Sequence, residues 1–221
     1  MAGITHRKPG RPTNQAVRHQ REEEILDAAA RLFAEHGFSA ANTQVLADTL
    51  GIGKGTIYRY FPSKQELFLA AVDRAMRQLT DTVDRALEGI EEPLVRMLRA
   101  MTTYLAYFAQ HPEYVELIIQ ERAQFKDRKK PTYFVHHDAN VVRWQTAFRA
   151  LTAAGRVRDV PAERITNVLS DMLYGRMFTN YFVGSTRSPE EQAQEIFDIA
   201  FYGVLSDSER TCARRHIESQ A

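Results

Sequence analysis

The sequence predicts an all-α protein that carries a helix-turn-helix pair near its N-terminus and a longer helical part behind it. Three observations predict this class. From about residue 21 onward, apolar residues recur three and four positions apart, which is the period of an amphipathic helix. Glycine and proline interrupt these runs at helix-length intervals. No alternation of apolar and polar residues is long enough to require a strand.

The composition limits the class of protein further. The chain has 221 residues, 44% of them hydrophobic and 10% aromatic, which excludes an intrinsically disordered chain. Cys212 is the single cysteine, so a disulfide scaffold is excluded as well. The 29 Lys and Arg residues nearly balance the 28 Asp and Glu residues, so any nucleic-acid signal must be local. Without a secretory signal or an apolar run of about 18 residues, we expect a cytoplasmic protein with no membrane partner.

Residues 1–20 are expected to form a flexible basic arm. Residues 1–21 contain five cations and no acid, and Pro9, Gly10 and Pro12 prevent a helix there. The Gly-Arg-Pro motif around Arg11 is similar to hooks that place an arginine in a narrow minor groove. A solvated tail without any partner explains the same residues equally well.

Start and stop signals divide the rest of the chain into helices. Gly37 is expected to end the first helix with a left-handed cap. Pro62 and Pro112 separate helices because proline lacks the backbone N–H, and Ser188 with Glu191 indicates a strong helix start. The predicted helices cover about residues 21–36, 43–50, 54–61, 63–87, 92–110, 112–127, 131–154, 161–183 and 189–206, and residues 207–221 are expected to form a frayed tail.

Residues 43–61 meet the physical requirements of a helix-turn-helix. Val45 and Leu46 are expected to supply apolar contacts inside the pair, and the small Ala47 lets the two helices approach closely. Gly51 can adopt a positive φ at the turn, and Ile57 faces the core. The residues left on or near the outward surface are Lys54, Gly55, Thr56, Tyr58, Arg59 and Tyr60.

These outward side chains suit a DNA duplex. Lys54 or Arg59 can reach a guanine or a phosphate, and Thr56 can meet a base edge. Tyr58 and Tyr60 can donate hydrogen bonds to phosphates. The alternative interpretation is a plain helical hairpin with a solvated cationic face.

The same segment resembles a known family, the TetR-type transcriptional regulators, over about residues 20–72. The resemblance rests on Gly37-Phe38, Thr43, Leu46-Ala47, Gly51-Ile52, the run from Lys54 to Phe61, Ser63-Lys64 and Glu66-Leu67. One departure is Gly53, where that family often has a capping serine, but glycine is an acceptable N-cap. The resemblance implies a homodimer that binds a partly palindromic double-stranded operator, usually as a repressor released by a small-molecule effector. It assigns DNA contact to Thr43, Gln44, Lys54, Gly55, Thr56, Tyr58, Arg59, Tyr60 and Lys64, and the arm adds Arg11.

The resemblance also implies a division into a helix-turn-helix domain, residues 21–66, and a helical ligand-binding and dimerisation domain, residues 67–206. Aromatic and methionine side chains of the middle helices, with two charges set among apolar neighbours, are the predicted ligand contacts: Tyr104, Phe108, Glu121, Phe125, Trp144, Phe148, Met172 and Arg176. Each of the two charges can instead face solvent or pair within the core. Apolar stripes of the two last helices are the predicted dimer interface, with Ile165, Val168, Leu169, Met172, Leu173 and Met177 on the first and Ile196, Ile199, Ala200, Gly203 and Val204 on the second. Ordinary intrachain core is the alternative for this last set.

No motif in the sequence supports catalysis, and no cofactor is expected. His136, His137 and Asp138 suggest a metal site, but no third ligand follows at a suitable spacing. The glycine run from Gly51 to Thr56 lacks the spacing of a phosphate-binding loop. Two alternatives to a DNA-binding regulator stay open, namely a helical protein-interaction adaptor and a small metal-dependent enzyme.

Overall fold

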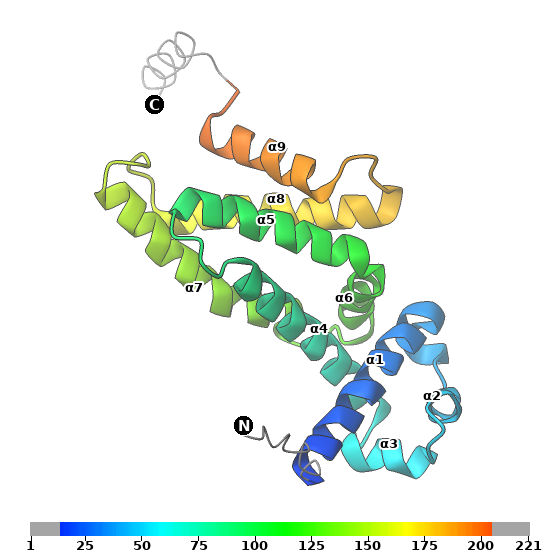
Figure 1. Ribbon diagram of the computed structural model, residues 1–221. Coiled ribbons are helices and arrows are strands. Elements are labelled where there is room, and N and C mark those ends of the chain that lie inside the picture. The colour runs from blue at the N-terminus through cyan, green and yellow to red at the C-terminus, as the bar shows by residue number, and fades with distance from the viewer. Residues whose placement is uncertain (1–13, 205–221) are drawn as a thin grey trace, which may run out of the picture. The chain divides into compact units, whose positions relative to one another are not determined.

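The computed structural model describes residues 14–204, and within this range it contains nine helices and no strand (Figure 1). The helices are α1 (Asn14–Ala40), α2 (Thr43–Thr49), α3 (Lys54–Tyr60), α4 (Lys64–Ala86), α5 (Pro93–Gln110), α6 (Pro112–Gln124), α7 (Thr132–Ala153), α8 (Ala162–Val183) and α9 (Pro189–Phe201). The predicted all-α class is therefore confirmed. Arg11 and the predicted tail from residue 207 lie outside the described residues.

Helix α1 begins earlier than the sequence predicts. It starts at Asn14, so residues 14–20 are helical rather than part of a flexible arm. The reason is that Pro12 is the last helix breaker before Gly37. Gly37 has a φ of 76° and a ψ of 156°, a combination essentially restricted to glycine, and it kinks α1 before a last turn that ends at Ala40. The positive φ agrees with the prediction, but this ψ is not that of a left-handed cap.

The described residues form two compact units, each discontinuous in sequence. The N-terminal unit comprises residues 14–76 and 116–133, and the C-terminal unit comprises residues 77–115 and 134–204. This division differs from the predicted boundary between residues 66 and 67. It adds the first half of α4 and the second half of α6 to the helix-turn-helix part.

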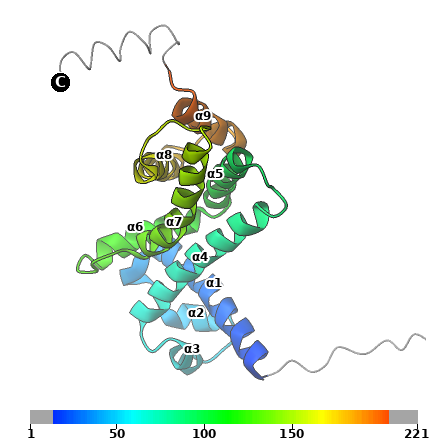
Figure 2. The ribbon, with the colours of Figure 1, turned by 90° about the vertical axis from the view of Figure 1, so that its left-hand side faces the viewer.

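In the N-terminal unit, α1, α2, α3 and the start of α4 enclose an apolar core (Figures 1 and 2). Leu46, Ala47 and Ile57 are no more than 1% exposed, so their predicted places in the core are confirmed. Val45 was expected inside the pair and is instead 47% exposed. The seven-residue α2 buries only the face that carries Thr43, Leu46 and Ala47.

The segment 116–133 packs on this helix-turn-helix part. The Phe125 ring lies 5.0 Å from that of Phe38 and 5.6 Å from that of Phe68, measured between centroids. Gln120 Nε2 donates a 2.8 Å hydrogen bond to the carbonyl oxygen of Phe33 on α1. Rings at these separations attract one another, so the contacts hold residues 116–133 to α1 and α4.

The C-terminal unit has its own apolar core, to which α5, α7, α8 and α9 contribute. Its buried members are Met97, Met101, Leu105, Phe148, Leu151, Ala162, Leu169, Ala193, Ile196 and Phe197. Helix α9 ends at Phe201 rather than near residue 206, because Gly203 closes it with a φ of 75°. The Gly203 N–H donates to the carbonyls of Asp198 and Ile199, as expected for a C-terminal glycine cap.

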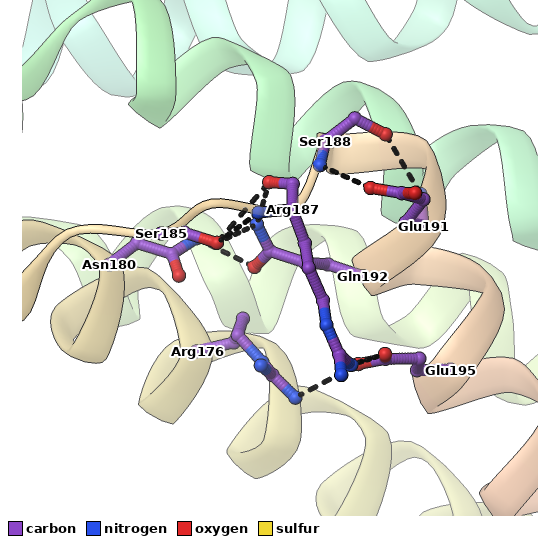
Figure 3. Close-up of polar contacts among 8 residues, drawn as sticks. All are labelled: Arg176, Asn180, Ser185, Arg187, Ser188, Glu191, Gln192 and Glu195. Atoms are coloured by element: carbon purple, nitrogen blue, oxygen red, sulfur yellow. Dashed lines mark hydrogen bonds and ion pairs between the residues drawn. The ribbon is translucent and has the colours of Figure 1, made fainter.

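Helices α8 and α9 are joined by a polar network (Figure 3). Gln192, only 2% exposed, accepts a 2.8 Å hydrogen bond from Asn180 and donates to Ser185 Oγ at 3.0 Å. Its second N–H donates to the Arg187 carbonyl at 2.9 Å. The side-chain amide of this buried residue is therefore fully used in fixing the hairpin. Of the helices between residues 14 and 204, none has the length and apolar character that a membrane span requires.

Candidate nucleic-acid interface

The α2–α3 pair is built around a short turn. Asn42 caps α2 by accepting a 2.9 Å hydrogen bond from the Gln44 N–H. Gly51 has a φ of 61°, as predicted for the turn, and the Ile52 N–H donates to the Ala47 carbonyl at 3.0 Å. Gly53 then caps α3 without a side-chain bond, and the buried Ile57 anchors α3 to the core.

Helix α3 presents its cations to solvent. Lys54, Gly55, Tyr58 and Arg59 are exposed, and Thr56 is half-buried. Neither Lys54 nor Arg59 forms an ion pair with any residue in the range 14–204. Both charges are therefore available for phosphates or guanine edges.

Thr43 and Tyr58 form a hydroxyl pair between α2 and α3. Their oxygens lie 3.0 Å apart, and Thr43 is only 4% exposed whereas Tyr58 is 37% exposed. Two hydroxyls carry two hydrogens, and the bond between them uses one. The pair therefore keeps one hydrogen to donate outward, and the exposed Tyr58 is the side chain that can reach a ligand.

Two further predicted DNA contacts are tied to the rest of the N-terminal unit. Lys64 Nζ donates a 3.0 Å hydrogen bond to the Ser39 carbonyl and lies 5.1 Å from the centre of the Phe38 ring. The Arg18 guanidinium lies 5.7 Å above the half-buried ring of Tyr60. An ammonium has three donors, so Lys64 keeps two of them for a phosphate.

Sequence reasoning missed two residues of this surface. The first is Asn42, which caps α2, although an Asn directly before a predicted helix is a recognisable N-cap signal. Asp48 is exposed and accepts a 2.8 Å hydrogen bond from Gln44 Nε2. The four-residue spacing of Gln44 and Asp48 on one helix was the signal for this pair.

The structure brings together only part of the predicted ligand set. Tyr104, Trp144, Phe148 and Met172 contribute to the core of the C-terminal unit, and the buried Phe108 lies against Tyr104 with ring centroids 5.0 Å apart. The other three predicted contacts, Glu121, Phe125 and Arg176, have partners of their own elsewhere.

Glu121 and Phe125 belong to the N-terminal unit. The Glu121 carboxylate, 1% exposed, accepts hydrogen bonds from the Thr132 N–H at 3.0 Å and the Thr132 hydroxyl at 2.9 Å. It also pairs with Arg128 at 3.3 Å. Arg176 lies 3.7 Å from Glu195 of α9, which also pairs with Arg187 (Figure 3). All three side chains thus have partners within the chain, and their predicted contact with a ligand stays a prediction.

The predicted dimer stripes are divided between core and surface. Leu169 and Ile196 are buried in the core of the C-terminal unit, against which Ile165, Met172 and Leu173 also pack. Ala200 is exposed, and Gly203 is the cap after α9 rather than a residue of its face. Val168 and Ile199 of the predicted stripes are exposed large apolar side chains, as are Phe182 and Val183 of α8 and Tyr202 directly after α9.

The metal alternative finds no support in the described part of the chain. Between residues 14 and 204, no three His, Cys, Asp or Glu side chains lie together in a way that could hold a metal ion. His137 Nδ1 instead lies 3.3 Å from the Asp138 carboxylate beside it.

An apolar core that supports an exposed cationic helix, here α3 after the turn at Gly51, is typical of DNA-binding proteins of the helix-turn-helix class. Residues 25–71 match the family model described as bacterial regulatory proteins, tetR family. Over 159 residues the chain is 30% identical to the HTH-type transcriptional repressor AcnR of Corynebacterium diphtheriae, a match that covers 70% of this chain and 78% of AcnR. The chain belongs to the TetR family of DNA-binding transcriptional regulators.

A further relative and two solved structures have lower sequence identity to this chain. The HTH-type transcriptional activator FasR of Mycolicibacterium smegmatis is 29% identical over 107 residues, 48% of this chain, and the chain spans about half (49%) of FasR. A transcriptional regulator from Saccharomonospora viridis, solved with choline, has a TM-score of 0.69 at 22% identity over 82% of this chain and 95% of that one. FadR from Bacillus subtilis, solved with stearoyl-CoA, has a TM-score of 0.68 at 13% identity over 83% and 99%. Identities this low show a shared fold alone.

Proposed function

We propose that this protein is a homodimeric cytoplasmic repressor that binds a partly palindromic operator and is released from it by a small molecule. The observation that carries the DNA-binding part is the exposed face of α2 and α3, where Lys54 and Arg59 have no acidic partner among residues 14–204. In a dimer the two α3 helices would enter successive major grooves about 34–36 Å apart.

Each residue of this face has a role set by its chemistry. Lys54 and Arg59 contact guanine or phosphate, and Thr56 contacts a base edge. The Thr43–Tyr58 pair donates its free hydrogen to a phosphate. Gln44 reads adenine, and Lys64 adds a phosphate contact at the start of α4.

The proposed dimer uses the exposed apolar side chains of α8 and α9. Phe182 and Ile199 are 65% and 50% exposed, which is costly for large apolar groups unless a partner covers them. A twofold dimer would bury these same side chains on both copies. F182D and I199D are expected to yield monomers in sedimentation, whereas V142D, an exposed valine of α7, should leave the dimer intact. Dimers in all three variants would refute this interface.

The proposed effector binds in the C-terminal unit near Tyr104, Phe108, Trp144, Phe148 and Met172. Their aromatic and thioether surfaces suit an apolar or flat molecule. Two structural neighbours were solved with choline and with stearoyl-CoA, which supports the proposal that this chain also binds a small molecule. The two ligands differ too much to indicate which molecule that is. Release from DNA requires that the effector bind the DNA-incompetent state more tightly.

The experiment that tests the function is selection of binding sites from random duplex DNA, with affinity measured at two salt concentrations. A partly palindromic winner and a steep salt dependence are expected of a sequence-specific dimer. Lys54→Ala should change the selected sequence, whereas Lys64→Ala should weaken binding to all sequences. If the full-length protein enriches no sequence, with or without candidate effectors, the adaptor interpretation replaces this proposal.

A further inference from the structure

We propose that Asp48 is a positioning residue for base recognition, which acts by fixing the orientation of the Gln44 amide. This inference rests on the proposed function, because it needs α2 and α3 to meet a duplex. The observation is the 2.8 Å hydrogen bond from Gln44 Nε2 to Asp48 Oδ1 on the exposed side of α2.

A glutamine amide can present either of two patterns to a base. It has a carbonyl acceptor and two N–H donors, and rotation about its last bond exchanges them. An ionised carboxylate only accepts hydrogen bonds, so Asp48 holds the NH₂ end of Gln44 toward itself. The side chain is then left with its Oε1 acceptor and one N–H donor.

This remaining pattern fits adenine and disfavours guanine. In the major groove, adenine presents an N6 donor next to the N7 acceptor, which match one acceptor and one donor of Gln44. Guanine presents two acceptors, O6 and N7, which require two donors from the protein. Because Asp48 occupies one N–H, the paired amide cannot supply both. We therefore expect the base that Gln44 reads to be adenine in preference to guanine.

The negative charge of Asp48 is also expected to favour sequence-specific binding over non-specific binding. It is the single acidic residue between positions 43 and 64, a segment that carries Lys54, Arg59 and Lys64. A carboxylate near phosphates weakens binding to every duplex and so opposes non-specific association. The hydrogen bond from Gln44 and the negative charge of Asp48 are therefore both expected to increase sequence specificity.

The two contributions separate in two measurements, namely base preference and affinity for random duplexes. D48A removes the hydrogen bond and the charge. D48N removes the charge and leaves an amide that can donate as well as accept, so it no longer fixes the orientation of Gln44. The control E35Q removes an equal charge from an exposed carboxylate of α1 that pairs with His36. Q44A and the double variant Q44A/D48A test whether Asp48 acts through Gln44.

The experiment measures Kd for the selected operator and for operators with adenine replaced by guanine at each position of the half-site. In the wild type, one position should prefer adenine by about ten- to a hundredfold, the range of a bidentate contact. D48A and D48N should each reduce that ratio at least about fivefold, while E35Q should keep it. The double variant Q44A/D48A should show the same adenine preference as Q44A alone. D48N should also bind random duplexes more tightly than E35Q does.

Three results would overturn the inference. The adenine preference could persist in D48A, or D48A could weaken all duplexes equally together with a lower Tm, which would make Asp48 a merely structural residue of α2. Failure of the wild type to select any sequence would instead refute the proposed function, and this inference with it. The wild-type selection therefore distinguishes the two failures.

Discussion

The substitution Y58F, which removes only the Tyr58 hydroxyl, tests the proposed contact between Tyr58 and DNA. In Y58F the ring stays, and the one hydrogen that the Thr43–Tyr58 pair can donate outward is lost from the exposed side chain. A hydrogen bond to a charged group contributes about 1.5–3 kcal/mol. A dimer on a full operator loses two such bonds, so Kd should rise by roughly two to four powers of ten.

The assay is fluorescence anisotropy of labelled operator and of random duplex across a salt series. Y58F removes a hydroxyl and no cation, so it should weaken binding to both duplexes alike and leave the slope of log Kd against log salt unchanged. An Arg59→Ala variant, which removes a cation, should change that slope by about one for each phosphate that Arg59 neutralises.

Stability must be separated from binding in this test. Y58F leaves the buried Thr43 hydroxyl without its partner and should lower the free energy of unfolding by about 1–3 kcal/mol. T43V/Y58F replaces both hydroxyls and should recover most of that loss, since apolar replacement of both partners is nearly neutral. The DNA defect should persist in the double variant. Operator binding by Y58F with wild-type affinity would refute the phosphate role of Tyr58.

Three other predictions concern the rest of the chain. Glu121→Ala removes the acceptor for three donor groups in the N-terminal unit, two on Thr132 and one on Arg128. It should lower the free energy of unfolding, measured in urea, by about 3 kcal/mol. An unchanged urea midpoint would contradict the stabilising role of this buried carboxylate. Gln192→Leu leaves the polar groups of the α8–α9 hairpin without partners and should cost about 2 kcal/mol in the same assay, with wild-type stability as the contrary result. The hydrogen bond from Arg156 lowers the pKa of the exposed Glu92 below its ordinary 4.5, so its stabilising effect is present above pH 4.5 and is lost as pH falls through the lowered pKa. Arg156→Ala should return the pKa of Glu92 toward 4.5 in an NMR titration, and no change would exclude Arg156 as its main cause.

Local signals in the sequence were sufficient for most helix boundaries. Pro62 and Pro112 act through their own backbone geometry, and Ser188 caps α9 through residues within one turn of it. Such signals need no knowledge of distant contacts. The start of α1 at Asn14 was missed for a related reason, because the absence of a breaker after Pro12 is a weaker signal than the presence of one.

Contacts between distant residues could not be predicted in this way. In the sequence, Glu121 is a charged residue among apolar neighbours. That pattern is compatible with exposure to solvent, with an ion pair in the core and with contact to a ligand. Only the fold shows that Thr132 and Arg128 surround it. Likewise, Phe125 gave the pattern of a pocket wall, but its ring packs on Phe38, which is far away in the sequence. The two predicted ligand contacts therefore have structural roles in the N-terminal unit.

The DNA-binding face was more predictable because its chemistry is local, yet the sequence could not rank its members. Lys54 and Arg59 are exposed as expected, whereas Thr43 is buried and acts through Tyr58. We propose a division of this face by physical role. Arg59 and Lys64 would determine affinity and its salt dependence, and the hydroxyl pair would add affinity without salt dependence. Gln44 with its carboxylate partner would determine base preference, to which Lys54 would also contribute. Salt slope, overall affinity and base preference are measured separately, so an Arg59, Tyr58 or Gln44 variant that changes only the quantities assigned to that residue supports this division. A variant of one of these three residues that changes all three quantities would mean that the helix pair itself has been disturbed.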